Sequence, residues 1–184
     1  NVLLPHLPYV PYPVGSPWHT VAIDFLTVAP TRSGVSKLLV VVDHFTRWAE
    51  AVPVAGESAA EALKALLCVF SIHGPPARVL SDQGSAFEAQ LFKDVLSQLG
   101  VAKSRTSVYH PNANGHVERF NSTILNLLRT HVTRVDAWQD HLRSVLWAYN
   151  TTPHSVTGYA PFFLMYGREP PTLFFPALEP YVDY

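Results

Sequence analysis

The sequence is poor in cysteine, in charge and in long apolar runs, and each shortage excludes a class of protein. Its one cysteine, Cys68, forms no internal disulfide and no cysteine-rich zinc site, which favours a reducing, intracellular setting. No apolar run reaches the roughly 18 residues that span a bilayer, so we expect no membrane partner. Residues 1–20 are broken by prolines and lack the basic segment of a signal peptide.

The small number of charged residues also limits the kinds of partner that the chain can bind. Charged residues make up 15% of the chain, and 13 Lys and Arg against 14 Asp and Glu give a net charge of −1. Dedicated nucleic-acid modules are usually strongly basic, so a nucleic-acid partner requires local clusters of cations, the nine histidines or domains outside this chain. The 48% of apolar residues and the length of 184 predict one compact domain with a sizeable core.

The apolar pattern begins with three strands, at 18–28, 36–45 and 47–54. A turn-forming TRSG joins the first two and predicts an antiparallel hairpin. The second strand is apolar on both faces and should therefore be central. Pro53 cannot donate to a ladder, which places the third strand at an edge of the sheet.

Strands and helices alternate after this triplet. We expect strands at 77–84 and 101–108 and helices at 57–74, 89–100, 113–133, 136–152 and 160–167. This order predicts a mixed α/β sheet with helices on both faces.

Single residues in these elements carry further expectations. Ser58 with Glu61 forms a capping box, and Gly74 is a stop for the same helix. Asp136 is expected to cap the helix that it begins. The buried positions of the helix at 57–74 are expected to be 62, 63, 66, 67 and 70, and Cys68 is interpreted as a small buried hydrophobe. The tryptophans expected in the core or an interface are Trp48, Trp138 and Trp147.

Three carboxylates stand at positions that suit chemistry. Asp24 lies in the middle of a strand, on the face of Ala22 and Leu26, where an ionised acid needs a cation or a metal. Asp82 follows the strand at 77–84, and ligands gather at such strand ends. Glu118 lies at the margin of the apolar stripe of its helix.

Each acid also has a plain structural interpretation. Asp24 could point to water or pair with an arginine, Asp82 could form a turn before Gly84, and Glu118 could interact with the helix dipole. Together, however, the three acids can converge at one edge of the sheet, where they repel each other unless cations are bound. Mg²⁺ or Mn²⁺ suits such oxygen ligands, and two ions about 3.5–4 Å apart support an in-line phosphoryl displacement.

Asp43, which ends a buried strand, is a fourth candidate acid or a cap of the strand end, and the cap is the favoured interpretation.

The motifs around these acids resemble the catalytic core of retroviral and long-terminal-repeat retrotransposon integrases, most closely the gypsy-like branch. Thirty-five residues separate Asp82 from Glu118. The motifs that carry the resemblance are SDQGSAF, HPNANGHVERFN, LLVVVDHFTRWAEAVPV and AYNTTPHSVTGYAPFFLMYGREPP. The resemblance covers about residues 17–172. We therefore divide the chain into a proline-rich linker at 1–17, a catalytic core at 18–172 and a tail at 173–184.

This resemblance implies an RNase H-like fold with a five-stranded mixed sheet. It implies a nucleotidyl transferase that uses two Mg²⁺ or Mn²⁺ ions per active site to trim DNA 3′ ends and join them to target DNA. Asp24, Asp82 and Glu118 match its catalytic, metal-binding acids. The implied partners are DNA and further copies of the chain, as a homodimer or larger assembly, and the implied location is the nucleus. Further domains are expected outside these 184 residues.

A DNA-contacting set is implied around Glu118. The segment HPNANGH, with His110, Asn114 and Gly115, matches the flexible loop that such enzymes place beside the DNA end, although Asn and Gly are also ordinary turn residues. Three residues of the following helix complete the set: Arg119, Ser122 and Arg129.

The chain departs from the family along the helix face of Glu118. Similar integrases carry basic residues at positions 122 and 125, whereas this chain has Ser122 and Leu125. Each lost phosphate contact weakens DNA affinity and flattens its dependence on salt. A second hypothesis is therefore an integrase-derived domain with weak or no catalysis that acts as a DNA- or protein-interaction module. A third, a ribonuclease that cuts RNA–DNA hybrids, shares the metal chemistry but is disfavoured by the integrase-like motifs.

Overall fold

A computed structural model of the chain describes residues 15–105, 111–131 and 134–171. It contains one five-stranded sheet with the strand order β3-β2-β1-β4-β5. The strands are β1 Thr20–Thr27, β2 Lys37–Asp43, β3 Ala49–Val54, β4 Arg78–Ser81 and β5 Ala102–Arg105. β2 pairs antiparallel with β1 and β3, and β4 pairs parallel with β1 and β5. The mixed sheet is confirmed, and so is the edge position of the strand that contains Pro53.

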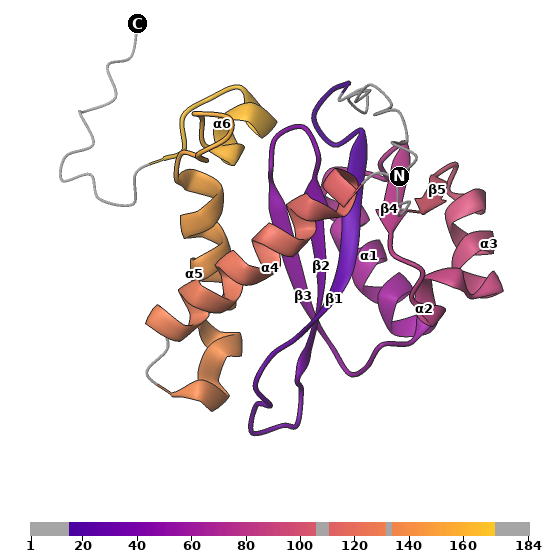
Figure 1. Ribbon diagram of the computed structural model, residues 1–184, viewed down its shortest axis with the longest axis horizontal. Coiled ribbons are helices and arrows are strands. Elements are labelled where there is room, and N and C mark those ends of the chain that lie inside the picture. The colour runs from indigo at the N-terminus through magenta and orange to yellow at the C-terminus, as the bar shows by residue number, and fades with distance from the viewer. Residues whose placement is uncertain (1–14, 106–110, 132–133, 172–184) are drawn as a thin grey trace, which may run out of the picture.

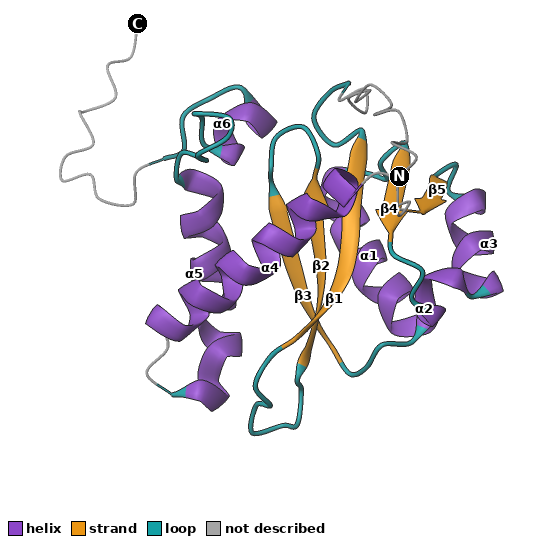
Figure 2. Cartoon of the chain, in the orientation of Figure 1, coloured by secondary structure: helices purple, strands orange, loops and turns teal. Residues whose placement is uncertain are grey.

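Helices cover both faces of this sheet (Figures 1 and 2). The helices are α1 Ala59–His73, α2 Ser85–Glu88, α3 Gln90–Gln98, α4 Pro111–His131, α5 Trp138–Thr151 and α6 Pro161–Tyr166, with a 3-10 turn at Val135–Ala137. In Figure 1, α4 crosses in front of the sheet and α1 lies behind it. None of the helices in the described ranges is long and apolar enough to cross a membrane.

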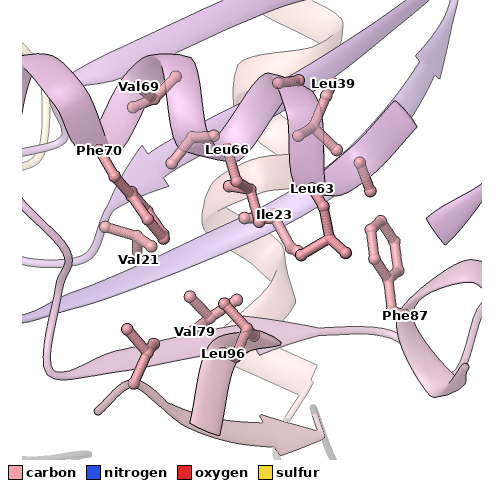
Figure 3. Close-up of a cluster of buried hydrophobic side chains, with 14 of the residues drawn as sticks. Val21, Ile23, Leu39, Leu63, Leu66, Val69, Phe70, Val79, Phe87 and Leu96 are labelled. Carbon is pink, nitrogen blue, oxygen red and sulfur yellow. The ribbon is translucent and has the colours of Figure 1, made fainter. Parts of the chain in front are cut away.

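The alternation of side chains along the strands builds two separate cores. Ile23 and Leu39 pack with α1 on one face, and Figure 3 shows this cluster. Ala22 and Val40 pack with α4 and α5 on the other face. β2 is buried on both faces, because Leu38 through Val41 have no exposed surface. The prediction of a central second strand is thereby confirmed.

The predicted stop and part of the predicted cap of α1 are confirmed. The Glu61 N–H donates to the Ser58 hydroxyl at 3.2 Å, and Gly74 ends the helix at φ +79°. The capping box is only half formed, because the Glu61 carboxylate accepts from the N–H of Ala55 instead of that of Ser58.

The predicted buried stripe of α1 is wrong at one position. Leu67 is 46% exposed, and Val69 takes its place in the core. Cys68 is exposed as well, so its interpretation as a buried hydrophobe is wrong. The run ALKALLCVF is apolar except at Lys64, so the pattern alone does not show which of its residues face the core.

The predicted cap at Asp136 is also wrong. Asp136 lies inside the 3-10 turn, and α5 begins two residues later without a side-chain cap. Its carboxylate instead forms ion pairs with Arg32 at 2.8 Å and Arg134 at 3.3 Å. Of the three tryptophans, Trp48 and Trp138 are buried, and Trp147 packs half-buried against the α1-side core.

Candidate active site

The register of the sheet brings the first two predicted acids to neighbouring positions. β1 and β4 run parallel, with Ala22 beside Leu80. Asp24 and Asp82 each lie two residues further along, so the same register aligns them. Asp82 directly follows β4, where the chain leaves the sheet. A carboxylate in the middle of one strand and one at the end of its neighbour therefore face the same edge of the fold.

Helix α4 adds the third acid. Its buried stripe of Val117, Phe120 and Ile124 packs on the sheet, as predicted. The Asn121 side-chain amide donates to Oδ2 of Asp24 at 2.9 Å, which ties the helix to the strand. Glu118 precedes Asn121 by three residues and therefore shares its side of the helix. It is exposed, at the margin of the stripe.

The electrostatics of Asp24 show that the other two acids act on it. Burial raises the pKa of Asp24 to about 6, and the negative charges of Asp82 and Glu118 add to the rise. The hydrogen bonds from the Phe25 backbone and from Asn121 oppose it. Asp24 is thus an acid whose ionised form is only partly compensated by the surrounding protein, which is typical of functional sites.

These acids fit a hard divalent cation by chemistry, but they do not form a preassembled site. In the described ranges no three His, Cys, Asp or Glu side chains are grouped closely enough to hold a metal ion. Asp82 is exposed, and its Oδ1 accepts from the N–H of Gly84 at 2.9 Å, so the turn interpretation is confirmed. An all-oxygen donor set with uncompensated negative charge is what Mg²⁺ and Mn²⁺ select. The metal-binding role of the three acids stays a prediction.

Asp43 caps the end of its strand, as favoured. It is fully buried, and its Oδ2 accepts from the backbone N–H of Thr46 at 2.8 Å and from the Thr46 hydroxyl at 2.7 Å. These bonds shape the turn between β2 and β3. Asp43 is therefore not grouped with the three candidate catalytic acids.

The predicted loop before Glu118 is partly helical. α4 begins at Pro111, so Asn114 and Gly115 lie in its first turns and not in a loop. Proline at the first helical position has the right φ and no N–H to satisfy, which explains the early start. His110 and the side chain of Asn114 lie outside the described residues, so their DNA-contacting role stays a prediction.

The remaining predicted DNA contacts lie on the outer side of α4. Ser122 and Arg129 are exposed, and the Ser122 hydroxyl donates to the backbone carbonyl of Glu118 at 3.3 Å. Leu125 is half-buried, and together with Arg129 and Trp138 it lines a cavity of about 260 Å³. The helix face that is basic in similar integrases is therefore apolar at this point.

Sequence reasoning missed a group of basic side chains near the start of α4. The rings of His44 and His116 meet edge to face at 5.1 Å between centroids. Burial and the positive charge of Arg47 lower the pKa of His116 to about 3, with smaller contributions from other basic neighbours. Nε of Arg119 donates to the backbone carbonyl of Gly115 at 2.8 Å. The signal in the sequence was the polar DHFTR that follows a buried strand.

Comparison with known families finds two matches along the chain. A family model described as "Integrase core domain" matches residues 16–111, and a second model with the same description matches residues 99–161. The Transposon Tf2-3 polyprotein of Schizosaccharomyces pombe is 32% identical over 172 residues, which cover 90% of this chain and 13% of that protein. The Tf2-4 polyprotein matches equally well. The chain thus spans about an eighth of the length of these curated relatives.

Comparison with solved structures supports the fold. The HTLV-2 integrase catalytic core in complex with magnesium has a TM-score of 0.68 and 23% identity, covering 82% of this chain and 97% of that one. The simian T-cell lymphotropic virus intasome in complex with the PP2A regulatory subunit B56 gamma gives a TM-score of 0.71 and 23% identity, with coverage of 92% and 61%. The BIV integrase core gives 0.64 and 21%, with coverage of 78% and 91%. These similarities confirm the expected RNase H-like fold.

Proposed function

Because the chain belongs to the integrase core domain family, we propose that it is the catalytic core of a polynucleotidyl transferase that trims DNA 3′ ends and joins them to target DNA. The observation that carries this proposal is the placement of the acids: the parallel register aligns Asp24 with Asp82, and α4, which carries Glu118, is hydrogen-bonded to Asp24 through Asn121. Burial raises the pKa of Asp24, and the charges of the two other acids add to the rise, which favours a site that works with bound cations.

In this proposal Asp24, Asp82 and Glu118 hold two divalent ions, and the related HTLV-2 core is a magnesium complex. The chemistry that bound Mg²⁺ or Mn²⁺ supplies is activation of the attacking hydroxyl and stabilisation of charge on the departing oxygen. Asn121 is a positioning residue, because its amide holds one carboxylate oxygen of Asp24. Oδ1 of Asp82, which accepts from Gly84 N–H, would have to exchange this hydrogen bond for an ion to complete the ligand set.

The proposed partners are DNA and further copies of the chain. Two DNA ends must be joined to one target, so two active sites are needed and a dimer or larger assembly follows. Solved relatives are described as dimeric and trimeric forms of a core and as an intasome. We also propose the nucleus as the location, because the proposed target is chromosomal DNA.

A nicking and joining assay tests the proposal. Branched and blunt-ended DNA are incubated with Mn²⁺ and with wild-type chain, Asp82→Asn or Asp94→Asn. Asp94 is exposed on α3 and accepts only from Gln90 in the described structure, so it offers the same chemical change away from the site. We expect products with the wild type and Asp94→Asn, and none with Asp82→Asn or with EDTA. Equal activity in all three proteins would contradict the proposed site.

The second hypothesis, an integrase-derived interaction module without catalysis, is favoured by two observations. No three metal-ligating side chains are grouped in the described ranges, and Ser122 and Leu125 stand where similar integrases have basic residues. Calorimetry separates the two hypotheses. Binding of Mn²⁺ that is lost in Asp82→Asn, without any turnover of DNA in the wild type, would support the module.

A further inference from the structure

Five side chains come from the β2–β3 turn, the first half of α4 and the region at the end of α5. These segments lie at the same end of the fold (Figure 1). We call the five side chains the basic cluster: Arg47, His116, Arg119, Tyr149 and His154. They come from three separate parts of the chain, and their charges act on one another. None of the five takes part in the proposed chemistry, although Arg119 belongs to the predicted DNA-contacting set.

Arg47 occupies a backbone position that does not favour arginine. Its φ is +67°, in the left-handed region that glycine and asparagine adopt most easily. The turn is fixed on both sides, because Asp43 N–H donates to Trp48 O at 2.8 Å and Arg47 N–H donates to Asp43 O at 3.1 Å. A glycine would fit this turn with less strain. The side chain of Arg47 therefore has a role that the turn itself does not require.

The guanidinium of Arg47 is directed inward without partners for two of its nitrogens. Nε and Nη1 are buried and have no hydrogen-bond partner among the described residues. Burial lowers the pKa of Arg47, and the charge of Arg119 lowers it further, whereas Asp43 opposes the shift. Oδ2 of Asp43 accepts two hydrogen bonds from Thr46, and its buried Oδ1 has no hydrogen-bond partner in the described ranges, so neither oxygen is bonded to Arg47. Buried charged donors without acceptors indicate a missing acceptor group.

The neighbours of Arg47 add donors. Tyr149 has its pKa raised to about 12 by burial, so its hydroxyl stays protonated. Nδ1 of His154 accepts from Val156 N–H at 3.2 Å, which leaves the proton of the neutral ring on Nε2. Tyr149 and His154 lie edge to face, with centroids 6.4 Å apart. The cluster thus offers N–H and O–H groups and two permanent positive charges, from Arg47 and Arg119.

We propose that the basic cluster binds one phosphate of the DNA backbone next to the three acids, an inference that rests on the proposed function. Arginine donors in a partly buried setting match phosphate oxygens better than any neutral ligand. Arg119 directly follows Glu118 in α4, so a phosphate held here belongs to the strand that enters the acidic site. The contact supplies part of the DNA affinity that the apolar position 125 does not.

The test measures DNA affinity without catalysis. A labelled 20-base-pair duplex is titrated in EDTA at several salt concentrations, using fluorescence anisotropy, with wild type, Arg47→Gln and Arg32→Gln. Arg32 is an exposed arginine of the β1–β2 loop and serves as the matched control. We expect the slope of log affinity against log salt to fall by about 0.9 for Arg47→Gln, the value for one lost phosphate contact. Arg32→Gln should keep the wild-type slope.

Arg47→Gly separates binding from folding. Because the backbone at this position suits glycine, the thermal midpoint of Arg47→Gly should stay within a few degrees of the wild type while the salt slope falls as in Arg47→Gln. A wild-type slope in both Arg47 variants would overturn the inference. So would stabilisation by inorganic phosphate that depends on Arg47 while the slope for duplex DNA is unchanged, since the cluster would then take a free phosphate.

The outcome for the basic cluster is independent of the outcome for the acids. Asp82→Asn binds DNA in EDTA with the wild-type salt slope if the cluster acts as proposed, even if the chain joins no DNA. A failed joining assay with a changed slope in Arg47→Gln therefore contradicts the catalytic proposal alone. An active enzyme with an unchanged slope contradicts the basic cluster alone.

Discussion

Both faces of the sheet are buried, but the polar side chains on the two faces differ in their surroundings. The face under α1 is filled mostly by apolar side chains such as Ile23 and Phe92, and the side chain of His73, only 4% exposed, is paired with Glu50 at 2.9 Å. The face under α4 and α5 contains Asn150 and Asp24 among its apolar residues. Asn150 is fully satisfied, since its amide both donates to and accepts from the backbone of Ala49 at 2.9 Å. Asp24 accepts a hydrogen bond from Asn121, yet its pKa is raised to about 6, as expected for an acid in the proposed catalytic role.

The largest effect is expected on the apolar face. Ile23→Ala should lower the free energy of unfolding by about 2–5 kcal/mol, because Ile23 is completely buried and leaves a cavity. Urea denaturation measures the loss. Ile72→Ala, at a position 73% exposed on α1, should change it by less than about 0.5 kcal/mol. Similar losses in both variants would contradict the described core.

Replacing Asp24 should raise the free energy of unfolding instead of lowering it. Its folded pKa of about 6 lies above the ordinary 3.8, so the wild type loses stability as the pH rises from about 4 to beyond 6. Asp24→Asn removes this loss and should be more stable than the wild type at pH 7 by about 1–2 kcal/mol, after allowance for solvent screening. Unfolding free energies at pH 4 and pH 7 give the comparison. A stability difference that does not grow with pH would show that Asp24 is not strained by its charge.

A smaller effect is expected at Asn121. Asn121→Ala removes a hydrogen bond to the ionised Asp24, so the pKa of Asp24 should rise above its wild-type value and the free energy of unfolding should fall by about 1 kcal/mol. Carbon-detected NMR titration of the Asp24 carboxyl measures the pKa, and the pH profile of Mn²⁺-dependent joining should move to higher pH. Asn126→Ala, exposed on the same helix, is the control. An unshifted Asp24 titration would exclude a positioning role.

The smallest effect is expected at Cys68. Cys68 is exposed on α1, so a maleimide should label it fully in the native protein. Cys68→Ser should change the free energy of unfolding by less than about 0.5 kcal/mol. Protection of the thiol from labelling in the isolated chain would indicate that this outer side of α1 is covered in solution.

Local chemistry explains what the sequence predicted well. Pro53 cannot donate to a ladder, so its strand was expected at an edge of the sheet. The run LLVVV is apolar on both faces, so its strand was expected at the centre. Asp24 alternates with apolar neighbours on a strand, which fixed its face. The strand end at Asp82 and the helix margin at Glu118 then predicted that the other two acids reach the same edge.

Long-range contacts explain what the sequence did not predict. Asp136 resembles a cap, but its carboxylate pairs with Arg32, which lies more than 100 positions earlier. The basic cluster depends on the left-handed turn at Arg47 and on α5 meeting α4, and no local pattern encodes either. The short helix α2 was missed because SAFE is too brief to show a period.

The pairing of β1 has a consequence for how the acids come together. Asp24 lies opposite the fully buried Val40 in the middle of the β1–β2 ladder, so its backbone has no freedom to shift. Asp82 and Glu118 lie on an exposed turn and an exposed helix side. In the proposed metal complex Asp24 therefore keeps its position, and the exposed Asp82 and Glu118 are the ligands that adapt to different metal ions or DNA ends.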